Sequence, residues 1–186
     1  MNMKNVKQDI KKGVGDLGDK LKMEKGQGYQ ALVGSVLQKS TMVKDILGMS
    51  DAMVEGIYGQ AYRLYNNGKY REAVHLFRML IMLNSIEPKY LMGLAACFHM
   101  LKEYQAAVDT YALCGFLDTG NPLPYFHASD CYLQMKDVPS AVVSLNLAIK
   151  RAQGKPEYKI LHDRCVITVE GLNKQLEEMY KNRKKG

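Results

Sequence analysis

The stretch "LYNNGKYREAVHLFRML" (64–80) decides the fold, because its pattern returns twice at a constant interval. Similar segments are "FHMLKEYQAAVDTYALC" (98–114) and "YLQMKDVPSAVVSLNLA" (132–148), and each begins 34 residues after the one before. An interval that holds through several independent columns indicates a structural repeat. One such column consists of the small residues Ala73, Ala107 and Ala141.

The repeats extend over residues 54–87, 88–121 and 122–155. Each contains two apolar stretches of about 13 residues with helical spacing, separated by a short polar break. A helix pair every 34 residues is the tetratricopeptide period, and one hairpin cannot bury its apolar face alone. The sequence therefore predicts an all-α solenoid of three stacked helical hairpins.

The remaining columns fit the packing of such hairpins. Small residues stand at the eighth position of each repeat, where the two helices approach closely: Ala61, Ala95 and Ser129. Large residues stand at the twenty-fourth position: Phe77, Tyr111 and Leu145. The tryptophan of the tetratricopeptide pattern is replaced by other large side chains at the fourth position: Ile57, Leu91 and Tyr125.

Three further segments flank the repeats. Residues 1–28 are basic and contain five glycines, which predicts a flexible extension. Residues 29–53 predict an N-terminal helical segment, and residues 156–186 a C-terminal capping helix with a basic tail. The N-terminal segment carries an apolar stripe that needs a surface to pack on, at Leu32, Val33, Val36 and Leu37.

Composition excludes several classes of function. The net charge of +7 comes from the ends, because residues 51–173 carry 12 basic and 12 acidic side chains. A nucleic-acid binder needs a basic face on its folded core, so nucleic acid is not an expected partner. No apolar run is long enough to span a membrane, which excludes direct insertion. Four cysteines without paired spacing predict reduced, mostly buried thiols in a cytosolic protein.

The first helix of each hairpin lines the concave face of such a solenoid. Its exposed columns predict a groove of aromatic and aliphatic side chains that binds an extended peptide. These residues are Tyr58, Tyr62, Tyr65, Met92, Ala96, His99, Phe126, Asp130 and Leu133. In the alternative interpretation, the three tyrosines pack against the N-terminal helix or a second subunit.

The sequence lacks the residue patterns of several well-known binding and catalytic sites. A clamp for a C-terminal carboxylate needs basic or amide side chains, where this chain has Tyr58 and Tyr62. His127 and Cys131 share a helix face and make half a metal site, but no second pair accompanies them. There is no phosphate loop and no nucleophile motif. The sequence therefore predicts neither an enzyme nor a bound cofactor or metal.

Several segments resemble one protein family. They are "STMVKDILGMS", "GIYGQAYRLYNNGKYREAVHLFRMLIMLN", "YLMGLAACFHMLKEYQAAVDTYALC" and "PLPYFHASDCYLQMKDVPSAVVSLNLAI". They are similar to the class II, or translocator, chaperones of bacterial type III secretion systems over roughly residues 40–155. Residues 1–39 are longer and richer in glycine than the family pattern.

The resemblance implies a bacterial cytoplasmic chaperone without ATPase activity. Its clients would be the hydrophobic translocator proteins that later form a pore in the host membrane. The concave groove would hold an extended client segment, and the N-terminal region would form a homodimer, which assigns the stripe at residues 32–37 to dimerisation. The alternative from the residues alone is a general protein-interaction scaffold without a role in secretion.

Overall fold

The computed structural model describes residues 43–183, and this part of the chain contains helices and no strand. The predicted all-α fold is confirmed. In chain order the elements are α3 (Val43–Ile46), α4 (Asp51–Asn66), α5 (Tyr70–Leu83), α6 (Pro88–Met100), α7 (Tyr104–Leu117), α8 (Leu123–Gln134), α9 (Val138–Ala152), a 3-10 turn (Pro156–Tyr158) and α10 (Lys159–Arg183).

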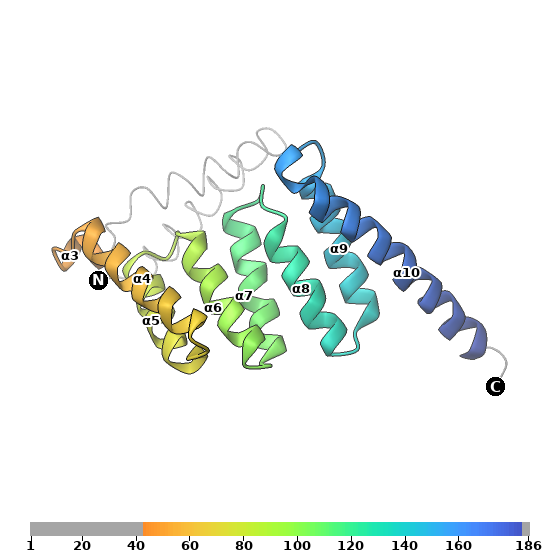
Figure 1. Cartoon of the computed structure of the whole chain (residues 1–186), viewed down its shortest axis with the longest axis horizontal. Helices are drawn as coiled ribbons and strands as arrows, with labels where there is room; N and C mark the ends of the chain where they lie inside the picture. Colours follow the sequence, from red (N-terminus) through yellow and green to blue (C-terminus); the bar gives the residue numbers. More distant parts are fainter. Residues whose placement is uncertain (1–42, 184–186) are drawn as a thin grey trace, which may run out of the picture. The chain divides into compact units, whose positions relative to one another are not determined.

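The helices between α4 and α9 form three antiparallel pairs that stack in chain order. Each helix packs on the one before it and the one after it, as Figure 1 shows. The pairs are α4 with α5, α6 with α7, and α8 with α9, so each falls on one 34-residue repeat. Contacts between successive neighbours are the signature of a solenoid.

The turns inside the three hairpins share one unusual backbone conformation. Gly68, Lys102 and Lys136 have positive φ angles of 74°, 63° and 62°. At each turn the following amide donates to a carbonyl five residues earlier, as from Lys69 to Leu64 at 2.9 Å. This arrangement is the Schellman motif, in which a left-handed residue ends a helix. The repeat therefore extends to backbone geometry.

Polar side chains accept backbone hydrogen bonds at the starts of α4 and α8. Ser50 accepts a hydrogen bond of 3.3 Å from the Met53 amide and so caps the start of α4. Gly48 adopts a positive φ of 64° just before it. Pro88 begins α6, and the Asn121 side chain accepts a 3.0 Å hydrogen bond from the Leu123 amide.

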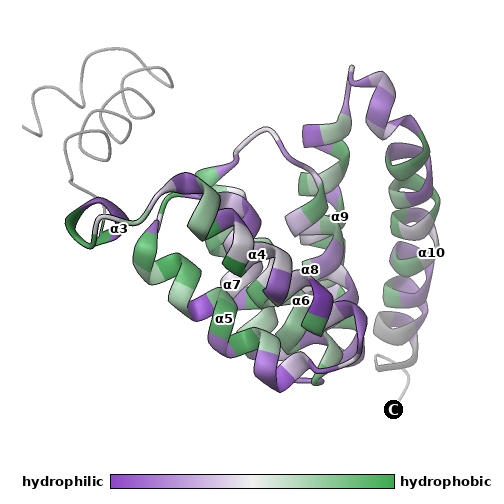
Figure 2. Cartoon of the chain, turned by 60° about the vertical axis from the view of Figure 1, so that its left-hand side comes forward, coloured by the Kyte–Doolittle hydropathy of each residue, from purple (hydrophilic) through white to green (hydrophobic). Residues whose placement is uncertain are grey.

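The core lies between neighbouring helices. Figure 2 shows both hydrophobic and hydrophilic residues on the helices, as an amphipathic stack requires. The predicted small columns are buried, because five of the six side chains are 0% exposed and Ser129 is 3% exposed. The predicted large column is also buried, at 1–2% exposure. These residues are Phe77, Tyr111 and Leu145.

The segments before and after the three repeats agree with the predictions to different extents. The stripe of Leu32, Val33, Val36 and Leu37 lies outside the described residues. The short helix α3 buries none of its residues, and Ile46 is 71% exposed. The predicted C-terminal helix is present as α10, which begins after a 3-10 turn and packs on α9 through the buried Cys165.

Candidate functional site

The candidate site lies on the first helices of the three hairpins, α4, α6 and α8. We call it the first-helix surface and define it by the nine residues that the repeat columns predict. None of the nine is fully buried, and two are exposed, Tyr62 and Asp130. The other seven are partly buried: Tyr58, Tyr65, Met92, Ala96, His99, Phe126 and Leu133.

Contacts between α4 and α6 join the first two parts of this surface. The Lys89 ammonium forms an ion pair with the Glu55 carboxylate, exactly one repeat earlier in the chain. The same ammonium lies 4.8 Å from the centre of the Tyr58 ring. The ion pair and the cation–π contact hold the two helices in a register that places Tyr58 beside α6.

A second contact joins α6 to α8. The Nε2 atom of His99 lies 3.4 Å from a carboxylate oxygen of Asp130. Both residues belong to the predicted set, and they come from successive first helices. Because Tyr58 contacts Lys89 of α6, and His99 of α6 contacts Asp130 of α8, the set extends over three neighbouring helices.

The tyrosines of α4 differ in how much of each ring is exposed to solvent. Tyr58 lies 5.7 Å from Tyr90 and 6.2 Å from Phe77 between ring centres, and Tyr65 lies 5.4 Å from Tyr70. Burial raises the pKa of Tyr58 and of Tyr65 above the ordinary value for tyrosine, which is already well above neutral pH, so both hydroxyls are protonated donors.

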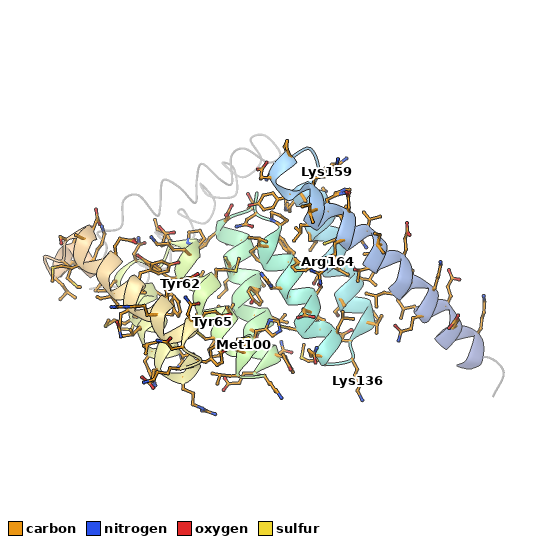
Figure 3. The ribbon with its side chains drawn as sticks, in the orientation of Figure 1. Tyr62, Tyr65, Met100, Lys136, Lys159 and Arg164 are labelled. Atoms are coloured by element: carbon orange, nitrogen blue, oxygen red, sulfur yellow. The ribbon has the colours of Figure 1, made fainter. Side chains whose placement is uncertain are left out.

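Tyr62 is the accessible member of this group. It stacks on Tyr58 at 6.4 Å between ring centres and remains 53% exposed. Figure 3 labels Tyr62 and Tyr65 on α4. An exposed aromatic ring supported by other rings is a typical anchor for a binding partner, because it offers large apolar area at small entropic cost.

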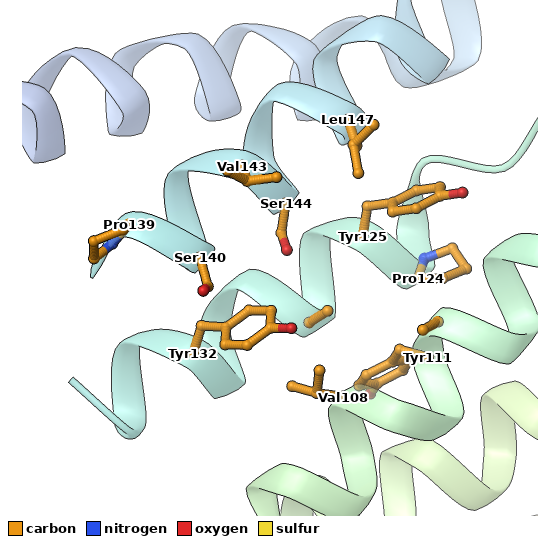
Figure 4. A pocket seen from close by; sticks show the side chains of 12 residues that line it. Val108, Tyr111, Pro124, Tyr125, Tyr132, Pro139, Ser140, Val143, Ser144 and Leu147 are labelled. Carbon is orange, nitrogen blue, oxygen red and sulfur yellow. The ribbon is translucent and has the colours of Figure 1, made fainter. Parts of the chain in front are cut away.

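A cavity of about 350 Å³ lies elsewhere, between α7, α8 and α9 (Figure 4). On α8 its lining includes Pro124, Ala128 and Tyr132. At about 100° per residue these positions lie on the opposite side of α8 from Phe126 and Asp130. The sequence analysis did not predict this cavity, and none of the nine residues lines it.

The thiols are structural. All four cysteines are buried and unpaired, as predicted. Burial raises the pKa of Cys97 and Cys131 to about 12 and of Cys114 to about 11. Burial therefore keeps these thiols in their neutral form at neutral pH, in which a thiol is a poor nucleophile.

His127 is part of the hairpin packing. Its ring stacks on Tyr111 at 5.6 Å between ring centres, and burial lowers its pKa. Among the described residues, no group of three or more histidine, cysteine and acidic side chains is placed to hold a metal ion. None of the described helices is both long and apolar enough to cross a bilayer.

Comparison with known proteins agrees with this architecture. A family model for the tetratricopeptide repeat matches residues 54–85 and 88–119. The low calcium response locus protein H of Yersinia pseudotuberculosis is 30% identical over 153 residues, which cover 81% of this chain and 91% of that protein.

Two solved structures are similar to this chain in both fold and sequence. PcrH, a Pseudomonas aeruginosa protein crystallised with the chaperone-binding region of PopD, is 29% identical with a TM-score of 0.66. That match covers 69% of this chain and 96% of PcrH. The Yersinia enterocolitica type III secretion translocator chaperone SycD, in an alternative dimer, is 30% identical with a TM-score of 0.65, covering 69% and 97%. The chain belongs to the class II, or translocator, chaperones of type III secretion systems.

Proposed function

We propose that this protein binds hydrophobic translocator proteins in the bacterial cytoplasm and keeps them soluble until they are secreted. The first-helix surface would hold an extended client segment. The observation that carries the proposal is the exposed ring of Tyr62 on a surface made continuous by contacts between successive first helices. The related PcrH has been crystallised with the chaperone-binding region of PopD, which supports the same role here.

The physical task is to shield apolar segments from water. A translocator exposes segments that would aggregate or insert into a membrane too early. Burial of about 400 Å² of client apolar area would contribute roughly 10 kcal/mol before ordering costs, at about 25 cal/mol per Å². Those costs cancel much of this gain, which leaves an affinity moderate enough for release.

The contacts on the surface suggest how a client backbone is recognised. Protonated hydroxyls of Tyr58 and Tyr65 can donate to backbone carbonyls, and the Asp130 carboxylate can accept from amides. Hydrogen bonds to the client backbone can form with any client sequence. Tyr62, Met92 and Phe126 would instead contact apolar side chains of the client. The combination favours an extended segment with spaced apolar residues. No catalytic step is required.

Self-association is the second part of the proposal. The stripe of Leu32, Val33, Val36 and Leu37 would bury its apolar face in a homodimer, with residues 1–28 as a basic flexible extension. The dimer of the related SycD supports this assignment. In this organisation the three hairpins (54–155) bind the client, and residues 156–186 cap the stack and end in a basic tail.

Co-expression with a translocator of the same secretion system tests the client role. The translocator should move from the insoluble to the soluble fraction and co-purify with the chaperone. Tyr62→Ala should weaken binding about tenfold, because exposed aromatic anchors carry a large share of binding energy. Tyr65 is a poorer target, because its contact with Tyr70 also supports the hairpin.

Phe116→Ala is the matched control, since Phe116 is 50% exposed on α7, away from the first-helix surface. Its binding should equal that of the wild type. A translocator that stays insoluble and does not co-purify would favour the general scaffold over a secretion chaperone. Equal binding by Tyr62→Ala and wild type would place the client elsewhere on the molecule.

A further inference from the structure

The C-terminal helix α10 takes the place of a fourth first helix in the stack. Cys165 follows Cys97 and Cys131 by the same 34-residue step, and all three side chains are 0% exposed. Like α6 on α5 and α8 on α7, α10 packs on the second helix of the preceding hairpin, α9. The repeat therefore continues in space, although the sequence pattern weakens after Pro156.

The same step places three α10 residues in the columns of the first-helix surface. Ile160, Arg164 and Ile167 follow Phe126, Asp130 and Leu133 by 34 residues each. The structure brings the two helices together at this point, because the Arg164 guanidinium lies 5.5 Å from the centre of the Phe126 ring. Figure 3 labels Arg164 on α10. The Arg164–Phe126 contact is of the same kind as the cation–π contact between Lys89 of α6 and Tyr58 of α4, although the two cations stand at different repeat positions.

Two faces of α10 are not covered by another described helix, and they differ in polarity. In the earlier repeats the fourth and eighth positions pack against the partner helix of the hairpin, and α10 has polar residues there, Lys159 and Asp163. The surface columns instead keep Ile160 at 86% and Ile167 at 70% exposure. Polar residues have replaced apolar ones on the face of α10 that has no second helix to pack on. The face in the surface columns has kept its isoleucines, which indicates that they contact another molecule.

We propose that the client-binding surface continues onto α10, where Ile160 and Ile167 contact aliphatic side chains of the client and Arg164 binds an acidic one. The inference rests on the proposed function, since the occupant is the same extended translocator segment. Continuity with the first-helix surface at Phe126 supports this occupant. Within the described part of the chain, no carboxylate forms an ion pair with the Arg164 guanidinium, which packs over the Phe126 ring at the edge of the first-helix surface.

Photo-crosslinking inside the assembled complex tests the contact directly. A photoreactive amino acid is placed singly at Ile160, Ile167, Tyr62 or Met82, and the chaperone is co-expressed with a translocator of the same secretion system. Met82 is the control, because it is 70% exposed on α5, which is the second helix of its hairpin. Adducts are expected from Ile160, Ile167 and Tyr62, and none from Met82.

The outcomes separate the inference from the proposed function. Adducts from Tyr62 alone would overturn the extension onto α10 and leave the first-helix surface intact. Absence of adducts from all three positions would overturn both. Adducts of equal yield from Met82 would show unspecific contact and also overturn the extension.

Charge variants test the acidic partner. Arg164→Glu should weaken translocator binding about tenfold, and Arg164→Lys should restore most of it, because the contact depends on charge. Lys174→Glu makes the same charge change at an exposed site on α10 and should bind like the wild type. Unaltered binding by Arg164→Glu, with thermal unfolding as a check on the fold, would remove the acidic residue from the proposal.

Discussion

The ring of Phe77 occupies the space that a side chain at Gly93 would need. A Cβ atom built on Gly93 would lie 2.2 Å from Cε1 and 2.3 Å from Cζ of that ring. Phe77 comes from α5 and is 1% exposed, and Gly93 lies in α6. The absence of a side chain therefore lets the first two hairpins approach closely.

Gly93→Ala should destabilise the fold despite the better helix propensity of alanine. Overpacking at a buried contact costs about 1–3 kcal/mol, because the ring and its neighbours must shift. The measurement is chemical denaturation of the two proteins. Gly59→Ala is the matched control, since Gly59 holds the same repeat position one repeat earlier and no described atom lies within 4 Å of its built Cβ. It should stabilise by about 0.5–1 kcal/mol. Equal effects at both sites would contradict the close approach.

Glycine at the other two hairpin turns should stabilise the protein. Lys102 and Lys136 have the positive φ that Gly68 adopts without strain. A residue with a Cβ is disfavoured in this conformation by about 1 kcal/mol or more. Replacement by glycine recovers only part of this cost, because glycine also makes the unfolded chain more flexible. Lys102→Gly and Lys136→Gly should each gain about 0.5–1 kcal/mol in denaturation. Gly68→Ala should lose a similar amount, and a gain there would rule out this explanation.

Enlargement of a packing alanine should destabilise the stack. Ala107 is 0% exposed in the middle hairpin, with helices on both sides. Ala107→Leu should cost about 1–3 kcal/mol or more, and more than Ala141→Leu, which lies nearer the end. Thermal unfolding of the single variants measures the order. Ala52→Leu, the same change at an exposed residue of α4, is the control and should stay within about 0.5 kcal/mol of wild type.

His127 should make the protein less stable in mild acid. Burial lowers its pKa from 6.5, and the charge of His99 lowers it further, against an opposite effect of Asp130. Below pH 6.5 the unfolded chain therefore binds a proton more readily than the folded one. Stability from the neutral ring is present above that pH and is lost as the pH falls toward the lowered pKa.

The pH dependence can be measured as the melting temperature at about pH 7.5 and about pH 5.5. His127→Phe should lose less stability over this interval than the wild type, because no proton can bind. His75→Gln changes an exposed histidine on α5 and should keep the wild-type dependence. The same slope in His127→Phe and wild type would assign the effect to other groups.

The proposed dimer predicts a change in mass. Leu32→Glu with Val36→Glu should shift the free protein from dimer toward monomer in sedimentation, because buried carboxylates are costly without partners. A drop in melting temperature at unchanged mass would instead indicate that the stripe packs within its own chain. Val43→Glu, at a 45% exposed residue of α3, is a control for a carboxylate added close to the stripe in sequence.

The repeat columns predicted much of the fold because helix pairing depends on local periodicity. Ala73, Ala107 and Ala141 are buried as their 34-residue step requires, and the breaks at the hairpin turns have one common backbone geometry. The surface columns also place Tyr62 and Asp130 among exposed residues. A pattern of spacing states which residues share a helix face, and this is a property of the chain alone.

What the sequence by itself determined is therefore the all-α class, the three hairpins and the face that each residue occupies. Only the tertiary structure decided how far Tyr58 and Tyr65 are covered by other rings, where the cavity between α7 and α9 opens, and that Arg164 reaches Phe126. The physical reason is that exposure and cavity shape depend on how closely separate helices approach. That distance is set by side chains far apart in sequence, such as Phe77 against Gly93.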